Sequence, residues 1–435
     1  MVDPSGRVSA RDYGFLAFLT LLNVLNFVDR QLLASFANFI VPDLGLTNAQ
    51  FGLLTGFAFL LFYATMGVLT GALADMVHRP RLIAAGLALW SALTAASGAA
   101  RGFVSLAIPR AFIGVGESAL TPTSMSLLAD RFPAARLGFA AAIYYLGVPI
   151  GVGASLLVAG YLGPAIGWRG SFYALGAIGL VLSVVMLFVR EPRHDPATHA
   201  AGAAARQRQS FRDIATTLWR ALRTAPALGY TLAGGVALHF ILGAAAFDQL
   251  WYVRERGFDR AFIAQATGWI GMTGGILGNL VGGVAGDWWL RRTGQGRPML
   301  LVWLGLAMAP FFVAYRLVEP DSIFFWLGIF LGFFKLGTFY GPTFSTVQEL
   351  VPARIRATVV AFYILLLNLV GLGFGITAGG FLIDRLIAAG VEEPYTKTLL
   401  GFTLLSLVAI PFFYAAGKRF EGDRERLREL EAATP

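Results

Sequence analysis

Long apolar stretches, separated by short polar segments, follow one another along the whole chain. A bilayer core of about 30 Å needs about 20 apolar residues in a helix. Six such stretches precede a polar segment at 190–226 and six follow it, which predicts an all-α membrane protein with twelve transmembrane helices in two pseudo-symmetric six-helix bundles. The predicted spans are 13–40, 50–74, 81–99, 103–129, 137–162, 171–189, 227–253, 262–286, 299–315, 323–347, 358–386 and 396–416.

The polar segment divides the chain into parts. Within it, Ser210-Phe-Arg-Asp213 resembles the start of a helix. Phe211, Ile214, Leu218 and Leu222 follow at helical spacing, which predicts an amphipathic helix on the cytoplasmic membrane face, with a flexible linker as the alternative. The predicted domains are an N-terminal bundle at 1–190, a linker at 191–226, a C-terminal bundle at 227–417 and a cytoplasmic tail at 418–435.

Composition agrees with this pattern. Charged residues make up 14% of the chain, against about 25% in soluble domains. The net charge of +9 would suggest a nucleic-acid partner for a soluble protein. Here most of the 34 Lys and Arg residues fall in the predicted loops on the side of the N-terminus, which places both termini and the linker in the cytoplasm. The chain has no cysteine, and its first apolar stretch is too long for a cleaved signal, so a bacterial inner membrane is expected.

Two short patterns occur once in each half. Gly71-Ala-Leu-Ala-Asp75 corresponds to Gly283-Val-Ala-Gly-Asp287, which lies 212 positions later. Asp130-Arg-Phe-Pro-Ala corresponds to Glu349-Leu-Val-Pro-Ala, which lies 219 positions later. The shared order and similar spacing indicate an internal repeat. Because each half contains an even number of helices, both insert in the same orientation, as in secondary transporters that bind substrate between parallel repeats.

These motifs resemble those of the major facilitator superfamily. The loop after the second helix, Gly71-x-x-x-Asp75-x-x-x-Arg79-x-Arg81, and the fourth helix, Arg110-x-x-x-Gly114-x-Gly116, are similar to two superfamily motifs. Within the superfamily, Asn26-Phe-Val-Asp29-Arg30-Gln31 and Gly114-Val-Gly-Glu117-Ser-Ala-Leu-Thr-Pro122 resemble the Spinster family. The resemblance covers the N-terminal half and, more loosely, helices seven and eight. It implies the major facilitator fold, in which helices one, four, seven and ten line the cavity.

Four ionisable residues lie within predicted helices of the first half: Asp29, Arg30, Arg110 and Glu117. Such residues are costly in a bilayer and are candidates for function. Their spacing puts Arg110 and Glu117 on one helix face, about 10 Å apart along the axis. An arginine that moves between carboxylates would switch their proton affinity, so Asp29, Arg110 and Glu117 are predicted to couple protons. A static buried ion-pair network is the alternative.

The Spinster resemblance implies that the matching acids and arginine also engage substrate. Arg30 either binds an anionic headgroup or neutralises Asp29, and Arg110 and Glu117 are further substrate-binding candidates. In the second half, Lys335 in the middle of helix ten is predicted to hold a substrate phosphate or carboxylate, with snorkelling to an interface as the alternative. His239 on helix seven is a substrate-binding candidate, although a hydrogen-bonded packing histidine is the commoner outcome.

Charges at the ends of helices two and eight are predicted to act as a conformational latch. An acid there can pair with a base or cap a helix start. Ordinary loop charge is the alternative. The candidates are Gly71, Asp75, Arg79 and Arg81, and the weaker copy Asp287 and Arg291.

The function expected from these features is transport of an amphiphilic lipid by alternating access, driven by the proton gradient. The lipid class, lysophospholipids or sphingosine phosphates, is implied by the resemblance alone. The partners expected are this substrate, protons and membrane lipids, with no nucleic acid, metal or cofactor, and the protein is expected to be a monomer. An organic-anion or drug transporter of the same fold is the main alternative. A membrane lipid enzyme lacks support because no catalytic or metal-ligand pattern stands out, and a non-transporting sensor is a further alternative.

Overall fold

The computed structural model describes residues 8–74, 77–191, 211–352 and 355–432. All regular elements within these ranges are helical. The chain divides into two compact units: the first comprises Met1–Arg206 and Gly257–Met272, and the second Gln207–Arg256 and Thr273–Pro435. Helix α14 therefore contributes to both units.

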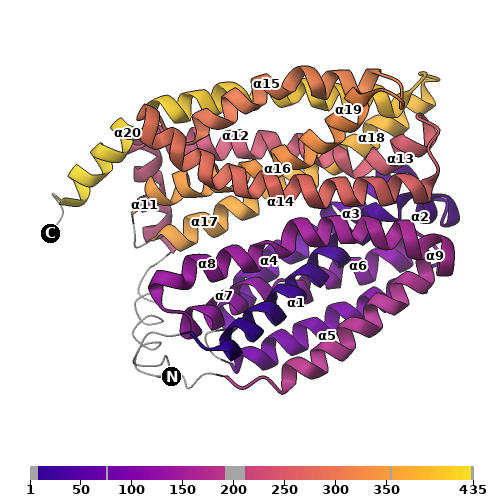
Figure 1. Cartoon of the computed structure of the whole chain (residues 1–435), viewed down its shortest axis with the longest axis horizontal. Coiled ribbons are helices and arrows are strands. Elements are labelled where there is room, and N and C mark those ends of the chain that lie inside the picture. The colour runs from indigo at the N-terminus through magenta and orange to yellow at the C-terminus, as the bar shows by residue number, and fades with distance from the viewer. Residues whose placement is uncertain (1–7, 75–76, 192–210, 353–354, 433–435) are drawn as a thin grey trace. The chain divides into compact units, whose positions relative to one another are not determined.

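Unit 1 is built mainly from the first nine helices, and α9 lies against α1 and α5 (Figure 1). A tight contact joins α9 to the first part of α14, where Gln265 Nε2 donates to the carbonyl of Gly160 at 2.9 Å. The helices are α1 (Ala10–Ser35), α2 (Ala37–Asp43), α3 (Asn48–Thr55), α4 (Phe57–Ala74), α5 (Arg79–Ser97), α6 (Phe103–Glu117), α7 (Leu120–Arg131), α8 (Ala134–Tyr145), α9 (Gly147–Leu187) and α14 (Arg260–Thr293).

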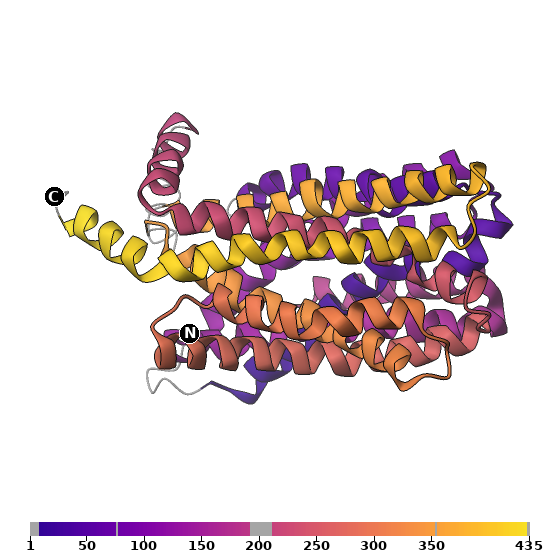
Figure 2. The ribbon, with the colours of Figure 1, turned by 90° about the horizontal axis from the view of Figure 1, so that it is seen from above.

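Unit 2 contains the remaining helices, and α12 and α20 run side by side (Figure 2). Phe339, Tyr363 and Phe413 are among the fully enclosed residues of its apolar core. The elements are α11 (Phe211–Thr224), α12 (Pro226–Gly243), η1 (Ala244–Phe247), α13 (Asp248–Arg254), α15 (Pro298–Leu317), α16 (Ile323–Glu349), α17 (Arg356–Leu365), the π-helix η3 (Leu366–Gly373), α18 (Phe374–Ala388), α19 (Pro394–Leu405), η4 (Ser406–Val408) and α20 (Ala409–Ala432).

Within the described residues, nine helical segments are long and apolar enough to cross a membrane. One of them, Arg136–Leu187, contains the fifth predicted span and most of the sixth. Its two parts meet at Gly167, whose φ of +70° favours glycine. The third and eighth predicted spans are not among these nine segments. They correspond to α5, which has arginines in its first turn, and α14, which has arginines in its last turn. The helical membrane fold expected from the sequence is confirmed.

Two segments outside the predicted spans also pack on unit 2. Leu218 and Leu222 of α11 contact the apolar core, so the expected membrane-facing stripe is partly covered by protein, while Trp219 is exposed. The segment expected to be a tail continues α20, and its Leu427 lies in the same core. Asp423 of this helix is buried and accepts a 2.8 Å hydrogen bond from the backbone N–H of Ala227 in the first turn of α12.

Glycines in the fourth predicted span allow close contact of three helices. A Cβ on Gly114 of α6 would lie 2.7 Å from the carbonyl oxygen of Phe59 in α4. A Cβ on Gly116 would lie 2.7 Å from the carbonyl oxygen of Gly86 and 3.0 Å from the Cβ of Trp90, both in α5. Real side chains do not fit at these distances, so α6 sits against its neighbours only because these positions lack a Cβ. Small residues are typical of such contacts between membrane helices.

Replacing Gly116 with valine should therefore destabilise unit 1. The added atoms overpack the α5–α6 contact, which costs about 1–3 kcal/mol or more. We expect a lower melting temperature and a smaller monodisperse fraction of the detergent-purified protein. Gly138→Val is the matched control, because Gly138 lies in α8, where a Cβ would have no other atom within 4 Å. Equal effects of the two changes would contradict the close-contact explanation.

Candidate functional site

A buried ion pair joins the first and sixth helices of unit 1. Arg30 of α1 donates from Nε and Nη2 to the same oxygen of Glu117, Oε2, at 3.2 and 3.1 Å. The side chain of Glu117 is fully buried, and that of Arg30 is 16% exposed. Arg30 is therefore the more exposed partner of the pair.

Arg110 links the same two helices through backbone carbonyls and forms no ion pair with a carboxylate of the described residues. From α6 it donates to the backbone carbonyls of Asp29 and Arg30, at 3.3 and 2.6 Å. Its guanidinium also lies 4.5 Å from the centre of the Phe59 ring. Arg110 thus places its positive charge beside Asp29 and Glu117 while it holds the backbone of α1.

Asp29 lies next to this pair but has a different partner. Its Oδ2 accepts a 3.0 Å hydrogen bond from the indole Nε1 of Trp90 in α5. Within the described residues, Oδ1 is buried and accepts no hydrogen bond. A buried carboxylate with one unengaged oxygen has room to hold a proton on that atom.

Aromatic rings surround the guanidinium of Arg30. The ring centres of Tyr63, Phe27 and Phe59 lie 4.2, 4.8 and 5.2 Å from its Cζ. Cation–π contacts of this kind stabilise a charge that has lost water. Asn26 of α1 lies beside the Glu117 carboxylate. We call Asp29, Arg30, Arg110 and Glu117, with Trp90 and these rings, the α1–α6 charge cluster.

The structure thus brings together the four predicted ionisable residues of the first half, all within unit 1. Arg30 pairs with Glu117 rather than with Asp29. Arg110 and Glu117 do not pair with each other, in agreement with their expected separation along α6. Sequence reasoning missed Trp90 and Tyr63, because their approach depends on how α4 and α5 pack against α1 and α6.

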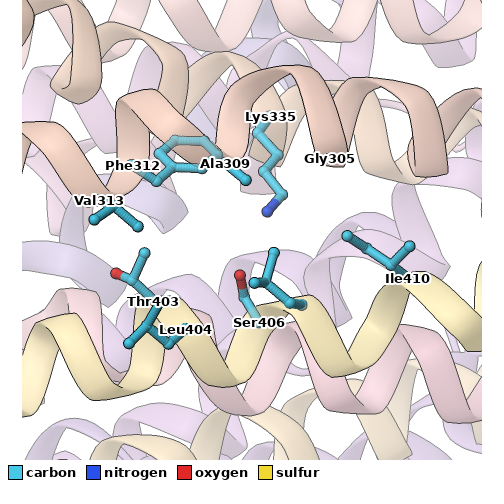
Figure 3. A pocket seen from close by; sticks show the side chains of 10 residues that line it. Gly305, Ala309, Phe312, Val313, Lys335, Thr403, Leu404, Ser406 and Ile410 are labelled. Atoms are coloured by element: carbon cyan, nitrogen blue, oxygen red, sulfur yellow. The ribbon is translucent and has the colours of Figure 1, made fainter.

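The two candidates of the second half lie in unit 2. His239 is buried, its Nδ1 lies 3.0 Å from the carbonyl of Gly235, and its ring packs on Phe339 and Tyr340. Lys335 extends from α16 into a pocket between α15 and the α19–α20 region (Figure 3). Their roles in substrate binding remain predictions.

Among the predicted latch residues of the first half, Arg79 has the strongest partners. It is buried, and its guanidinium binds Asp130 at 2.6 Å, Glu191 at 2.8 Å and the Ser126 hydroxyl at 2.9 Å. Arg81, by contrast, is exposed. Gly71 lies near the end of α4, and Asp75 lies outside the described residues.

In unit 2 the corresponding acid, Asp287, pairs with an arginine outside the predicted latch residues. Arg297 binds Asp287 at 2.7 Å and Glu349 at 2.6 Å, while Arg291 is exposed. Glu349 also accepts a 3.3 Å bond from Arg424. The acids Asp130 and Glu349 mark equivalent positions of the internal repeat, and each binds an arginine at or just before the start of another helix of its own unit. The repeated motif around Asp130 and Glu349 was therefore the sequence signal that could have led from the Arg79–Asp130 pair to a matching arginine, Arg297, for Glu349.

A second buried ion pair, missed by the sequence reasoning, lies in unit 2. Arg316 of α15 binds Asp248 at the start of α13 at 2.8 Å, and both lie beside Tyr252 and Tyr315. Asp248 follows Asp29 by 219 positions, the same offset that separates Asp130 from Glu349. The repeat therefore places an aspartate at equivalent positions of both units, with Trp90 as donor in one and Arg316 in the other.

Comparison with known proteins identifies the family. The sequence profile of the Major Facilitator Superfamily matches residues 19–376. The chain belongs to this superfamily. It is therefore an integral, multi-pass membrane transporter. The matched region includes the entire α1–α6 charge cluster as well as Lys335 and His239.

Individual relatives of this transporter differ in what they carry. An MFS-type efflux pump of Mycolicibacterium smegmatis is 29% identical over 95% of this chain and 94% of its own length. The hexuronate transporter of Bacillus subtilis is 27% identical, covering 85% and 87%. Protein spinster of Drosophila melanogaster is 24% identical, covering 81% and 59%. A crystal structure of a bacterial homologue of the human lysosomal transporter Spinster, inward-facing and unoccupied, has a TM-score of 0.81 at 22% identity, covering 96% and 99%.

Arg79 and Arg81 provide a matched test of whether the ion-pair network around Arg79 stabilises unit 1. Arg79→Ala leaves two carboxylates without their guanidinium, and we expect a loss of about 2 kcal/mol or more, since both acids are partly buried. Arg81→Ala removes an exposed charge and should change stability by less than about 0.5 kcal/mol. Thermal unfolding of the purified protein measures both. Similar losses of stability in the two variants would show that the buried ion pairs of Arg79 do not stabilise the fold.

Glu191 gives this network a defined pH dependence. Burial acts to raise the pKa of Glu191, but hydrogen bonds from Arg79 and the charges of Arg79 and His78 outweigh it and hold the pKa below its ordinary value of 4.5. The stabilisation is therefore complete above pH 4.5 and is lost as the pH falls through the lowered value. The difference in melting temperature between wild type and Glu191→Gln should be largest at neutral pH and shrink as the pH falls below 4.5. A difference that is constant with pH would contradict this assignment.

Proposed function

We propose that the protein is a proton-coupled secondary active transporter of an amphiphilic lipid, of the lysophospholipid or sphingosine-phosphate type, working by alternating access. The Arg30–Glu117 pair carries this proposal. A fully buried carboxylate is held by an arginine that is partly accessible, with a second buried acid, Asp29, directly beside it. Such groups are costly inside a membrane protein and mark proton or substrate pathways.

The coupling follows from competition for one guanidinium. When Glu117 takes up a proton, its charge is lost and the pair with Arg30 weakens. Arg30 is then available to a phosphate or carboxylate of the substrate, while the rings of Tyr63 and Phe27 contact the adjoining apolar part. Because linkage is reciprocal, a bound anion also favours the protonated form of Glu117. Arg110 stays on the α1 carbonyls and keeps the two helices in register.

Two observations support the lipid as substrate over a small hydrophilic anion. The rings around Arg30 are apolar on most of their surface, and Spinster proteins are among the relatives. An organic-anion transporter is the second candidate, because the B. subtilis relative carries hexuronate and covers most of both chains.

Lys335 and His239 remain candidates for substrate contacts in unit 2, and the latch residues for control of the transport cycle. We place the protein in the bacterial inner membrane with both termini in the cytoplasm.

Removing either acid should uncouple transport from the proton gradient. Asp29→Asn and Glu117→Gln keep the shape of each side chain but cannot gain or lose a proton. We expect at least a tenfold loss of gradient-driven lysolipid transport in proteoliposomes, with the pH dependence flattened. Asp43→Asn is the matched control, because Asp43 also accepts a hydrogen bond from a tryptophan, Trp168, at 3.0 Å but is 43% exposed. Unchanged pH profiles in both cluster variants would overturn the coupling role.

The substrate class requires a separate comparison. Lysophosphatidylcholine, lysophosphatidylglycerol and sphingosine 1-phosphate are tested against glucuronate in the same vesicles under the same gradient. Transport of the lipids alone supports the proposal. Transport of glucuronate alone establishes the organic-anion alternative while leaving the proton-coupling role of the α1–α6 charge cluster intact.

A further inference from the structure

A pocket in unit 2 has a lysine at its centre and no acid to match it. It lies between α15, α16 and the α19–η4–α20 segment. A second pocket adjoins it and shares Gly305, Lys335, Ser406 and Ile410. The side chain of Lys335 extends across the pocket toward Ser406 (Figure 3).

Lys335 has no acidic partner within the described part of the chain. No carboxylate there forms an ion pair with it, and its nearest interaction is with the Phe312 ring, 4.8 Å from Nζ to the ring centre. The other lining residues are mostly apolar. An ammonium group in such surroundings is unfavourable unless an anion joins it.

The break between α19 and α20 adds a polar group opposite Lys335. Helix α19 ends at Leu405, and η4 (Ser406–Val408) interrupts the regular hydrogen bonding before α20 begins. The hydroxyl of Thr403 is used locally, since it donates to the carbonyl of Leu399 at 2.8 Å. The Ser406 hydroxyl points into the pocket and is the second polar group that a ligand would meet (Figure 3).

The rim of the pocket is apolar and exposed. Leu404 and Leu407, which line it, and Leu306, which follows the lining residue Gly305 in α15, are 49%, 39% and 47% exposed. In a membrane transporter such a surface faces acyl chains. A ligand that enters here therefore carries an apolar chain, which remains along this surface while its polar end reaches Lys335.

The depth of Lys335 selects among anionic groups. It lies 12 residues after the start of the 27-residue helix α16, which is about 18 Å along the axis and near the middle of the span. A phosphate headgroup resides at the bilayer interface, about 15 Å from the midplane. A carboxylic acid differs, because in its protonated form it is neutral and can reach this depth without carrying charge through hydrocarbon.

We propose that this pocket binds the carboxyl end of a single-chain fatty acid drawn from the bilayer. The neutral acid enters beside α15 and α20 and transfers its carboxyl proton to the neutral amine of Lys335, so that a neutral acid and a neutral amine become a carboxylate–ammonium pair. Ser406 donates a hydrogen bond to the second carboxylate oxygen. No net charge is transferred, whichever of the two atoms holds the proton. The site uses none of the residues of the α1–α6 charge cluster, and its occupation can be measured without measuring transport.

A photoreactive fatty acid tests this directly. The full-length protein in phosphatidylcholine nanodiscs is labelled with a lauric acid that carries a diazirine on its chain, and the labelled peptides are mapped by mass spectrometry. We expect labelling of α15 and the α19–α20 segment. Unlabelled lauric acid should prevent it at concentrations at least tenfold below those needed for dodecanol or dodecyl phosphate.

The chain offers its own control, because it contains only two lysines besides Lys335, namely Lys397 and Lys418. Lys335→Met should reduce labelling of these segments at least tenfold, and Ser406→Ala should reduce it a few-fold. Lys397→Met and Lys418→Met should not change it. Equal competition by acid and alcohol in the wild type, or labelling that survives Lys335→Met, would overturn the proposal. Stronger competition by dodecyl phosphate would overturn the selection of a carboxyl group by depth.

Discussion

The pairing of buried charges between α1 and α6 is the constraint on which the rest of unit 1 depends. Arg30 and Glu117 neutralise each other, and Arg110 is held by two backbone carbonyls of the opposite helix. A charge left alone in these surroundings would cost several kcal/mol. Gly114 and Gly116 let α6 pack closely against α4 and α5, the helices that carry the Phe59, Tyr63 and Trp90 side chains of the cluster.

The internal repeat has kept positions more faithfully than partners. Asp130 and Glu349 each bind an arginine near the start of another helix, Arg79 or Arg297. The second acid of each arginine differs in place: Arg79 also binds Glu191, which follows α9, whereas Arg297 also binds Asp287 in α14. Glu349 in addition binds a second arginine, Arg424. The aspartates 29 and 248 likewise occupy equivalent positions but accept from an indole in one unit and a guanidinium in the other. The two units thus share a backbone plan with different electrostatics.

The sequence was sufficient for the fold and for the identity of the charged residues in α1 and α6. Long apolar stretches, the repeated motifs and the cost of ionisable groups in a membrane are all local properties of the chain. Partners could not be predicted, because which side chain meets Glu117 or Asp29 depends on helix rotation and on contacts of α4 and α5. For the same reason the pairing of Asp287 with Arg297 could not be predicted, and Arg291, which lies nearer to Asp287 in sequence, is exposed. The η4 break opposite Lys335 likewise has no distinct sequence signal.

The hydrogen bond from Ala227 to Asp423 has a practical consequence for handling this transporter. It closes a loop of almost half the chain, because the last helix supplies the acceptor for the first turn of α12. Purification tags, fluorescent fusions or shortened expression versions joined before Leu427 would remove or disturb that carboxylate and expose an otherwise satisfied amide. Engineering of the C-terminus is best confined to positions beyond Ala432, where the helix ends.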